Sequence, residues 1–346
     1  MKLCFMGRVI FFLFLFSPVV PWEKALAAES EEERTARLAE GAKKEGRLLW
    51  YAALTVEEGD RLLRKFQEKY PFINAGIYRA GGQVLLTRIM AEVQSKKPLF
   101  DVVHTAVAGI QTLKKKGIFV PYDSPQRKFL SEGFKDSEGY WSAIYLNLNA
   151  MGYNTRLVSP REAPRSYEDL LAPRWKGKMG MDTKAFEWFG HMLKIMGEKK
   201  GLEFMRRLSE QNIQFRTGKT LITQLVAAGE MSIGITLYNQ RVEEMKAEGA
   251  PIEWIAPEPV IPDINPLSIS AQAPHPNAAR LLVDFILSRE GQQVIAGFRR
   301  IPTRVDVDPL VPKLKQGLKI LPYDFSVAED YEKYGIMYRD ILMKGK

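Results

Sequence analysis

The sequence predicts an α/β protein with two domains, the second inserted into the first. The chain has 346 residues, of which 46% are hydrophobic and 26% charged, and domains of roughly 100–200 residues make two the expected number. Segments typical of strands and helices alternate along most of the chain, which favours parallel βαβ units. Four prolines within 256–266 indicate an extended crossing, after which the pattern of the first domain resumes.

Residues 1–27 have the pattern of a secretory signal peptide. Lys2 and Arg8 flank an apolar run at 9–16, and small residues at 25–27 suit a signal peptidase, so we expect cleavage near Ala27–Ala28. The run is shorter than the ~20 residues that span a bilayer. The mature protein is therefore expected in the periplasm. Cys4, the one cysteine of the chain, lies in this leader, which excludes disulfides, thiolate metal sites, thiol catalysis and a lipid anchor.

The charge balance favours an anionic partner over nucleic acid. The net charge is +9, and the leader accounts for +2 of it (Lys2, Arg8 and Lys24 against Glu23), which leaves +7 for the mature chain. The basic residues are scattered rather than gathered with aromatic residues into a stripe. We therefore expect no nucleic-acid binding.

The first domain begins with alternating helices and strands. Thr55 and Glu58 form a capping-box pattern, and the helix that they open keeps apolar residues on one face until Pro71. We expect helices over 29–44, from 55 and after the turn at 79–83, with strands over 47–52, 72–78 and 100–104.

The second domain shows the same alternation. We expect strands within 142–153 and over 178–181, 213–216 and 231–237, and helices over 166–171, 186–196, 201–211 and 220–228, the last ended by Gly229. A strand over 267–271 and helices over 277–287 and 288–297 follow the crossing. The expected first lobe is 28–139 plus 266–305, the second is 140–265, and 306–346 packs across the hinge or on the second lobe.

Four segments together resemble the periplasmic solute-binding proteins of ABC importers, in the group that includes the ferric-ion-binding proteins. They are RAGGQ at 79–83, YEDLLAPRWKGK at 167–178, AAGE at 227–230, and APHPNAA at 273–279 followed by FILSREGQ at 285–292. The resemblance covers roughly residues 45–305. It implies a two-lobed fold of the type II periplasmic-binding-protein class, a small-molecule ligand in the cleft between the lobes, a membrane permease as partner, a monomer and no cofactor.

Ligands of open α/β sheets sit at the carboxyl ends of strands, where helix N-termini point free N–H groups. The candidate ligand-binding residues therefore lie at strand-to-helix turns. Gly81 and Gly82 allow a close approach to an anionic group, with Arg79 or Arg241 as its counter-charge, or they only form a tight turn. The full set is Tyr51, Thr55, Arg79, Gly81, Gly82, Gln83, His104, Thr105, Asp182, Thr183, Trp188, Tyr238, Asn239 and Arg241.

Tyr238 bears on whether iron is the ligand. It stands where the resemblance places two adjacent tyrosines as iron ligands, but its neighbour is Asn239. Fe(III) prefers anionic oxygen ligands, so this departure argues against iron and no metal ligands are assigned. If the ligand were nevertheless ferric ion, Tyr238, Tyr51 and His104 would be the candidate ligands.

Enzyme motifs are missing from the sequence. It has no Gly-x-Ser-x-Gly, no His-Glu-x-x-His and no phosphate loop ending in Lys-Ser/Thr. The function that we expect is capture of a small organic, oxyanionic or zwitterionic solute for import. A ferric-ion receptor and an exported hydrolase on the same architecture remain the alternatives.

Overall fold

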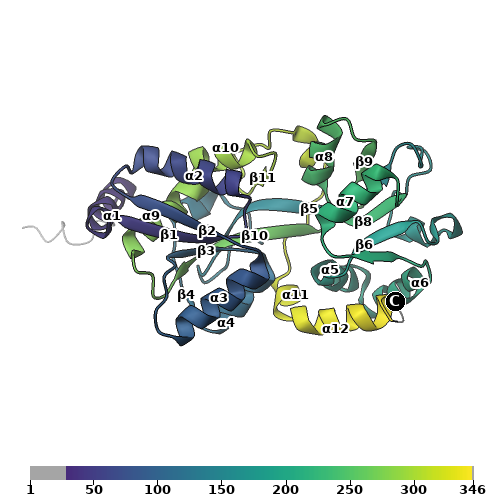
Figure 1. Ribbon diagram of the computed structural model, residues 1–346, viewed down its shortest axis with the longest axis horizontal. Helices are drawn as coiled ribbons and strands as arrows, with labels where there is room; N and C mark the ends of the chain where they lie inside the picture. Colours follow the sequence, from purple (N-terminus) through teal and green to yellow (C-terminus); the bar gives the residue numbers. More distant parts are fainter. Residues whose placement is uncertain (1–28, 345–346) are drawn as a thin grey trace, which may run out of the picture.

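A computed structural model describes residues 29–344, and it consists of two lobes joined by a pair of long strands (Figure 1). The strands within 29–344 form one sheet whose main path of pairing has the order β2-β1-β3-β10-β5-β8-β6-β7, and β4, β9 and β11 pair with strands of this path from outside it. The predicted signal peptide lies outside the described residues. None of the helices within 29–344 combines the length and the hydropathy that a membrane span requires.

The first lobe is a mixed sheet covered on both faces by helices. β1 (Arg47–Ala52) pairs in parallel with β2 (Asn74–Arg79) and β3 (Val102–His104), and β10 (Pro262–Ser270) runs antiparallel to β3. Short β4 (Phe119–Val120) pairs antiparallel with one end of β10, and short β11 (Ile301–Pro302) pairs antiparallel with β5 (Ser142–Asn154). Its helices are α1 (Glu31–Glu45), α2 (Val56–Lys69), α3 (Gly82–Gln94), α4 (Val107–Lys115), α9 (Pro276–Leu287) and α10 (Arg289–Ala296), with a 3₁₀ turn at Pro125–Phe129.

Alternation along β1 divides the core of this lobe into two parts. Trp50 and Ala52 pack with α2 and α9 on one face, whereas Tyr51 packs with α3 and α4 on the other. Successive side chains of a strand point to opposite faces, so a short buried strand can contribute to both cores. The parallel strands β1, β2 and β3 end at a common edge of the sheet, and α2, α3 and α4 begin at this edge.

The second lobe repeats this arrangement. β8 (Ile233–Tyr238) pairs in parallel with β6 (Met179–Asp182), and β6 with β7 (Gln214–Arg216), while β9 (Ile252–Ile255) pairs with β5. Its helices are α5 (Phe186–Met196), α6 (Glu198–Ser209), α7 (Lys219–Ala228) and α8 (Asn239–Ala247). α7 ends at Gly229, whose φ of 87° is left-handed, as the sequence predicts.

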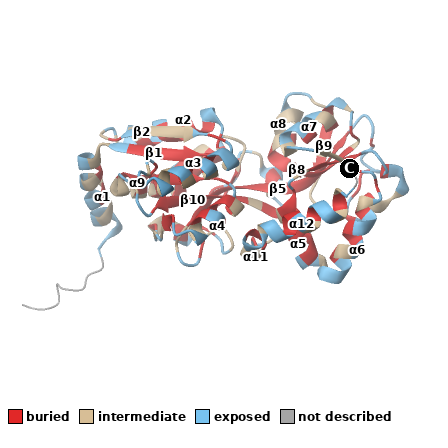
Figure 2. Cartoon of the chain, turned by 60° about the horizontal axis from the view of Figure 1, so that its bottom comes forward, coloured by how far each residue is buried: buried red, intermediate tan, exposed pale blue. Residues whose placement is uncertain are grey.

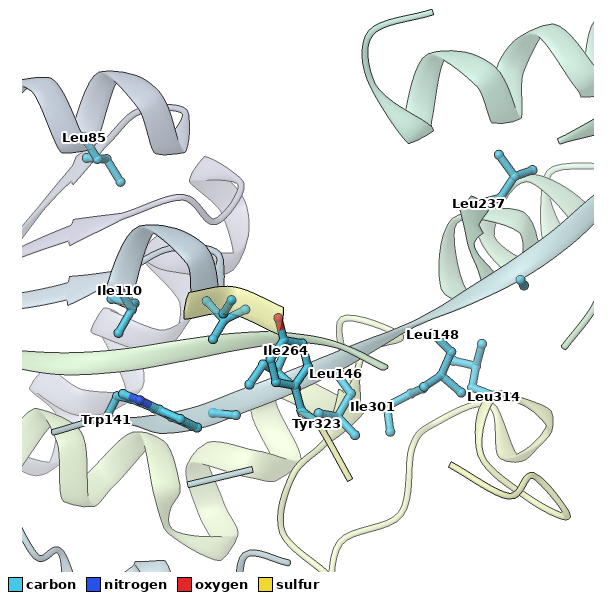
Figure 3. Close-up of a cluster of buried hydrophobic side chains, with 14 of the residues drawn as sticks. Leu85, Ile110, Trp141, Leu146, Leu148, Leu237, Ile264, Ile301, Leu314 and Tyr323 are labelled. Carbon is cyan, nitrogen blue, oxygen red and sulfur yellow. The ribbon is translucent and has the colours of Figure 1, made fainter. Parts of the chain in front are cut away.

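β5 (Ser142–Asn154) and β10 connect the lobes. All thirteen residues of β5 are buried, and it pairs with β10 and β11 in the first lobe and with β8 and β9 in the second. Figure 2 shows this burial along both strands. Figure 3 shows Leu146 and Leu148 of β5 near Ile264 of β10, with Tyr323 and Leu314 beside them. These side chains form an apolar cluster along the hinge.

The proline-rich stretch is partly regular structure. Its second half, from Pro262, is the beginning of β10, and the register with β5 shifts between Asn265 and Pro266. A bulge tolerates a proline within a sheet because one residue there leaves the ladder. The strand predicted from 267 therefore begins five residues earlier in the structure.

Two other segments refine the expectations. The helix predicted at 166–171 is a 3₁₀ turn at Glu168–Leu171, since Pro173 directs Ala172 to extended backbone and a second 3₁₀ turn, Pro173–Trp175, follows. A further 3₁₀ turn lies at Pro312–Leu314. Near the C-terminus, α11 (Phe325–Glu329) contacts α4 and α5. α12 (Tyr331–Leu342) packs on α5 through Tyr338, which meets Phe186 at a ring distance of 5.4 Å.

Candidate functional site

The ends of the parallel strands of both lobes face each other across a cleft. Five of the helices that begin there in the described chain have no side-chain cap: α3, α4, α5, α7 and α8, whose N-cap residues are Gly81, Ala106, Ala185, Gly218 and Tyr238. In contrast, α2 is closed by a capping box of Thr55 and Glu58. A first turn without such a cap presents backbone N–H groups and positive partial charge at the cleft. In α8, however, the Asn239 side chain accepts the N–H of Gln240 at 2.9 Å, and in α4 the Glu187 carboxyl accepts the N–H of Ala108.

One cavity, here called the lower cavity, has a volume of about 730 Å³. It lies between α3 and α4 of the first lobe and α5 and α12 of the second. Its polar residues include Gln83, Thr105 and Lys184, and its lining from the first lobe also includes Gly82, Leu86, Met90, Ala91, Ala106, Ala108 and Gly109. The first turns of two uncapped helices therefore meet an apolar wall in this cavity.

A second cavity, the upper cavity, has a volume of about 470 Å³. It lies between α2 and the segment 297–300 of the first lobe and the first turns of α7 and α8 in the second. Its lining consists of Thr55, Glu57, Glu58, Arg61, Thr220, Tyr238, Gln240, Arg241, Glu244 and the segment 297–300. Its charges are largely paired: Arg300 with Glu58 at 2.8 Å and Arg241 with Glu244 at 2.9 Å.

A polar cluster ties the second lobe to the hinge strands. Lys219, the first residue of α7, donates to Asn149 of β5 at 2.8 Å and to Asp263 of β10 at 3.1 Å. The hydroxyl of Tyr238 donates to the same Asp263 oxygen at 3.1 Å, and the Lys219 ammonium lies 4.3 Å from the centre of the Tyr238 ring. Lys219 and Asp263 are mostly buried, so each charge depends on the other.

Glu187, in the first turn of α5, lines the lower cavity. Burial, and after it the nearby Asp263 carboxylate, raise the pKa of its carboxyl to about 7, against the opposing effects of the Tyr323 hydroxyl, Lys219 and the Ala108 N–H. Tyr323 donates to Glu187 at 3.0 Å. Ala108 belongs to α4 of the first lobe, so the Glu187 carboxyl of the second lobe contacts the N-terminus of α4 across the cleft.

The structure brings six of the predicted residues to the two cavities. Gly82, Gln83 and Thr105 line the lower cavity, and Thr55, Tyr238 and Arg241 line the upper one. A methyl group at Gly82 would lie 2.8 Å from the Thr105 hydroxyl, so glycine is needed for α3 to start this close to β3. Gly81 lies beside this turn with open space around it.

The other predicted residues make contacts within the fold and line neither of the two cavities. Tyr51 is buried, and its hydroxyl donates to Glu92 and accepts from Arg88 in the second half of α3, away from the helix start. Trp188 packs against Tyr167 in the core of the second lobe rather than walling the cleft. The exposed Arg79 donates to the carbonyl of Leu54 at 3.0 Å and bridges two strand ends.

Asn239, Asp182 and Thr183 are likewise engaged in local structure. The Asn239 amide is fully buried, accepts the N–H of Leu148 and donates to the carbonyl of Leu314, so it fastens α8 to the hinge. The Asp182 carboxylate accepts the N–H of Lys184 at 2.9 Å, which forms the turn before α5. Thr183 pairs with the Thr217 hydroxyl at 3.0 Å.

His104 is completely buried, beside Trp50 and Tyr145, and lies beneath the cleft. Burial lowers the pKa of its ring to about 3, so it stays neutral, and neither ring nitrogen has a hydrogen-bond partner among residues 29–344. The ferric set of Tyr238, Tyr51 and His104 is therefore not assembled. No group of three or more His, Cys, Asp or Glu residues able to hold a metal occurs within 29–344.

The sequence analysis missed Glu187, which lines the lower cavity, and the pair of Lys219 and Asp263, which ties the second lobe to the hinge strands. Glu187 and Lys219 belong to the first turns of helices that the sequence predicts, so extending the search beyond the turn itself would have found them. Asp263 lies in the proline-rich crossing, and its place opposite Lys219 depends on the register of β10 with β5.

The fold is that of the type II periplasmic binding proteins, two lobes closing on a cleft. Iron-bound HitA from Pseudomonas aeruginosa superposes with a TM-score of 0.73 at 20% identity, covering 84% of this chain and 99% of that one. AfuA from Actinobacillus pleuropneumoniae, solved with fructose-6-phosphate, gives a TM-score of 0.74 at 23% identity, covering 87% and 99%. Both likenesses concern the fold.

The sequence comparisons then give the family. The family model of bacterial extracellular solute-binding proteins matches residues 97–328, and the chain belongs to this family. A Fe(3+)-binding periplasmic protein of Serratia marcescens is 23% identical over 230 residues, which cover 63% of this chain and 67% of the relative. The resemblance stated from the four sequence segments is thereby confirmed.

Proposed function

We propose that this chain is the substrate-binding component of an ABC importer, which captures a small organic anion or zwitterion in the periplasm and hands it unaltered to a membrane permease. The observation that carries the proposal is the convergence of helix N-termini on one interlobe cleft, where α3, α5 and α7 begin without a side-chain cap. Such termini hold anionic groups through backbone N–H donors. The family and the net charge support the same partner chemistry.

Native mass spectrometry of the purified protein tests this proposal directly. We expect a bound organic solute that carries a carboxylate, phosphate or phosphonate group. Added back at a hundredfold excess over its Kd, it should stabilise the protein by about 2.7 kcal/mol and raise the Tm accordingly. A ligand that is purely cationic would contradict the anion proposal.

Two further measurements separate the receptor from its alternatives. Recovery of the solute intact after prolonged incubation distinguishes a receptor from an exported hydrolase. N-terminal sequencing of protein from the periplasm should begin near Ala28 if residues 1–27 are a signal peptide. Retention of Met1 on a cytoplasmic product would contradict export.

A ferric-ion receptor is the second candidate. Tyr238 and Asp263 place two oxygen donors 3.1 Å apart in the cleft, and Tyr323 with Glu187 supplies another pair of oxygens at 3.0 Å. Two of the similar proteins carry iron in their names. Addition of Fe(III) should then produce a visible absorption band from tyrosinate coordination, and its absence would leave the organic anion as the ligand.

A further inference from the structure

One wall of the lower cavity is apolar. A receptor for a bare oxyanion would not need such a wall, because a bare oxyanion has no apolar part to contact it. Gly82, Leu86 and Met90 follow one another at i, i+4 spacing on α3 and line the same side of the cavity. Across from them α4 contributes small residues, Ala108 and Gly109, to the lining, and a methyl group at Gly109 would lie 3.6 Å from Leu86, so Leu86 lies directly against this part of α4. The wall therefore continues from the helix start well into the body of α3.

The opposite side of this groove is supplied by the second lobe. Tyr331 and Glu332, at the start of α12, line the cavity opposite the α3 wall. The Tyr331 ring rests against Phe186 at 5.2 Å, which fixes its position. An apolar body placed in the groove would thus contact aliphatic side chains on one side and an aromatic ring on the other.

The end of the same cavity next to the strands is polar. α3 and α4 both start there with N-cap residues that make no side-chain hydrogen bond, and the Glu187 carboxyl of the second lobe accepts the N–H of Ala108 in α4. Thr105 lies between the two helices, lines the cavity and is 2% exposed, and its hydroxyl makes no hydrogen bond to any residue within 29–344. The hydroxyl is therefore available to a group supplied by a ligand in the cavity. Lys184 adds an exposed ammonium from the second lobe that forms no ion pair within the described residues.

We propose that the lower cavity selects an organic anion in which a compact acidic group is joined to an apolar body. The acidic group binds at the first turn of α3, with the Thr105 hydroxyl and Lys184 as further donors, and lies beside the Glu187 carboxyl that occupies the start of α4. The apolar body lies along Leu86 and Met90 and faces Tyr331. A volume of about 730 Å³ suits an organic molecule of this kind. This inference rests on the proposed function and narrows its ligand class.

Paired probes test the inference by calorimetry at constant pH and salt. Each pair shares an acidic group and differs in its body: phenylphosphate against inorganic phosphate, and phenylacetate against acetate. We expect the aromatic member of a pair to bind at least tenfold more tightly. We also expect 2-phenylethanol, which lacks the acid, to show no measurable binding.

Three variants locate the effect in the cavity. Leu86→Asn should remove most of the advantage of the aromatic probe. The matched control is Val84→Asn on the same helix, because Val84 is 54% exposed and belongs to neither of the two described cavities; it should leave both affinities unchanged. Thr105→Val, which keeps the side-chain shape, should weaken the aromatic acid and the bare acid by a similar factor.

Several results would overturn the inference. They are equal affinity for both members of a pair, equal loss in the Leu86 and Val84 variants, or binding of 2-phenylethanol as strongly as of the acids. A failure of all the acids to bind also refutes this ligand class. If native mass spectrometry nevertheless finds another bound solute, the receptor function stands while the amphipathic ligand class fails.

Discussion

Replacement of Glu187 by Gln probes the electrostatics of the cleft. Burial and Asp263 raise the pKa of the Glu187 carboxyl from 4.5 to about 7. At 1.36 kcal/mol for each pH unit, ionising it in the native state costs roughly 3 kcal/mol relative to the unfolded chain. Glu187 is only partly buried in the cavity, so solvent screening reduces the expected value to about 2 kcal/mol.

The sign of the pH dependence follows from the direction of this change. A carboxyl with a raised pKa favours the folded state below about pH 4.5, and this contribution is lost as the pH rises toward 7. Glutamine stays neutral at every pH and still accepts the Tyr323 hydroxyl. Glu187→Gln should therefore stabilise the protein at pH 8 by about 2 kcal/mol and have little effect near pH 5.

Urea unfolding of both proteins between pH 5 and pH 8 measures this difference. Calorimetry with the phosphate and phenylphosphate probes adds a functional readout, because removal of the negative charge should strengthen anion binding at pH 8. A stability difference that does not change with pH would refute the reasoning. So would a variant that is less stable than the wild type at pH 8, since the carboxylate would then be a favourable partner of Lys219.

Three further predictions concern stability in urea unfolding. Gly82→Ala should lower the free energy of unfolding by about 1–3 kcal/mol, because its methyl group would lie 2.8 Å from the Thr105 hydroxyl. Gly81→Ala should leave the stability unchanged, because no atom lies within 4 Å of the added methyl group. Equal effects of the two substitutions would contradict this reasoning. Lys219→Met should lower the free energy of unfolding by about 3 kcal/mol, because it leaves Asp263 unpaired, whereas Lys184→Met should lower it by under about 0.5 kcal/mol. A smaller loss for Lys219→Met would show that the hinge cluster does not stabilise the fold. Glu58→Gln should lower the free energy of unfolding by about 3 kcal/mol at pH 7, and by less as the pH falls below 4.5. Burial raises the pKa of Glu58, but Arg300 and Thr55 outweigh burial and lower this pKa. A loss that is constant with pH would show a steric cause.

The secondary structure could be predicted closely where periodicity and caps agree. The strand at 47–52 and the helix at 186–196 have the predicted limits. The helix at 166–171 was wrong because a following proline, rather than the cap, decides the backbone there. The extent of β5 was predicted to within one residue, but not that residues 142–154 form one strand, since a strand shared by two lobes depends on its partners β10 and β8.

The site was predicted at the level of turns but not of side chains. Tyr51 and His104 are strand residues, and strand side chains point to the faces of a sheet, where helices bury them. Thr55, Gly82 and Thr105 follow the strand ends, so they reach the cleft. Residues in the first turns of the helices, such as Glu187 and Lys219, reach it as well, which defines where to search in related sequences.

The distribution of charge in the cleft favours the proposed anion over a ferric ion. Asp263 is neutralised by Lys219 and Glu58 by Arg300, while Glu187 is held close to protonation at neutral pH. The helix N-termini and the Lys184 ammonium then add positive charge at the cleft. Burial and nearby carboxylates also raise the pKa of Tyr238 and of Tyr323 well above 10. Iron would have to displace both phenolic protons against these effects, whereas an acidic solute meets donors that are already in place.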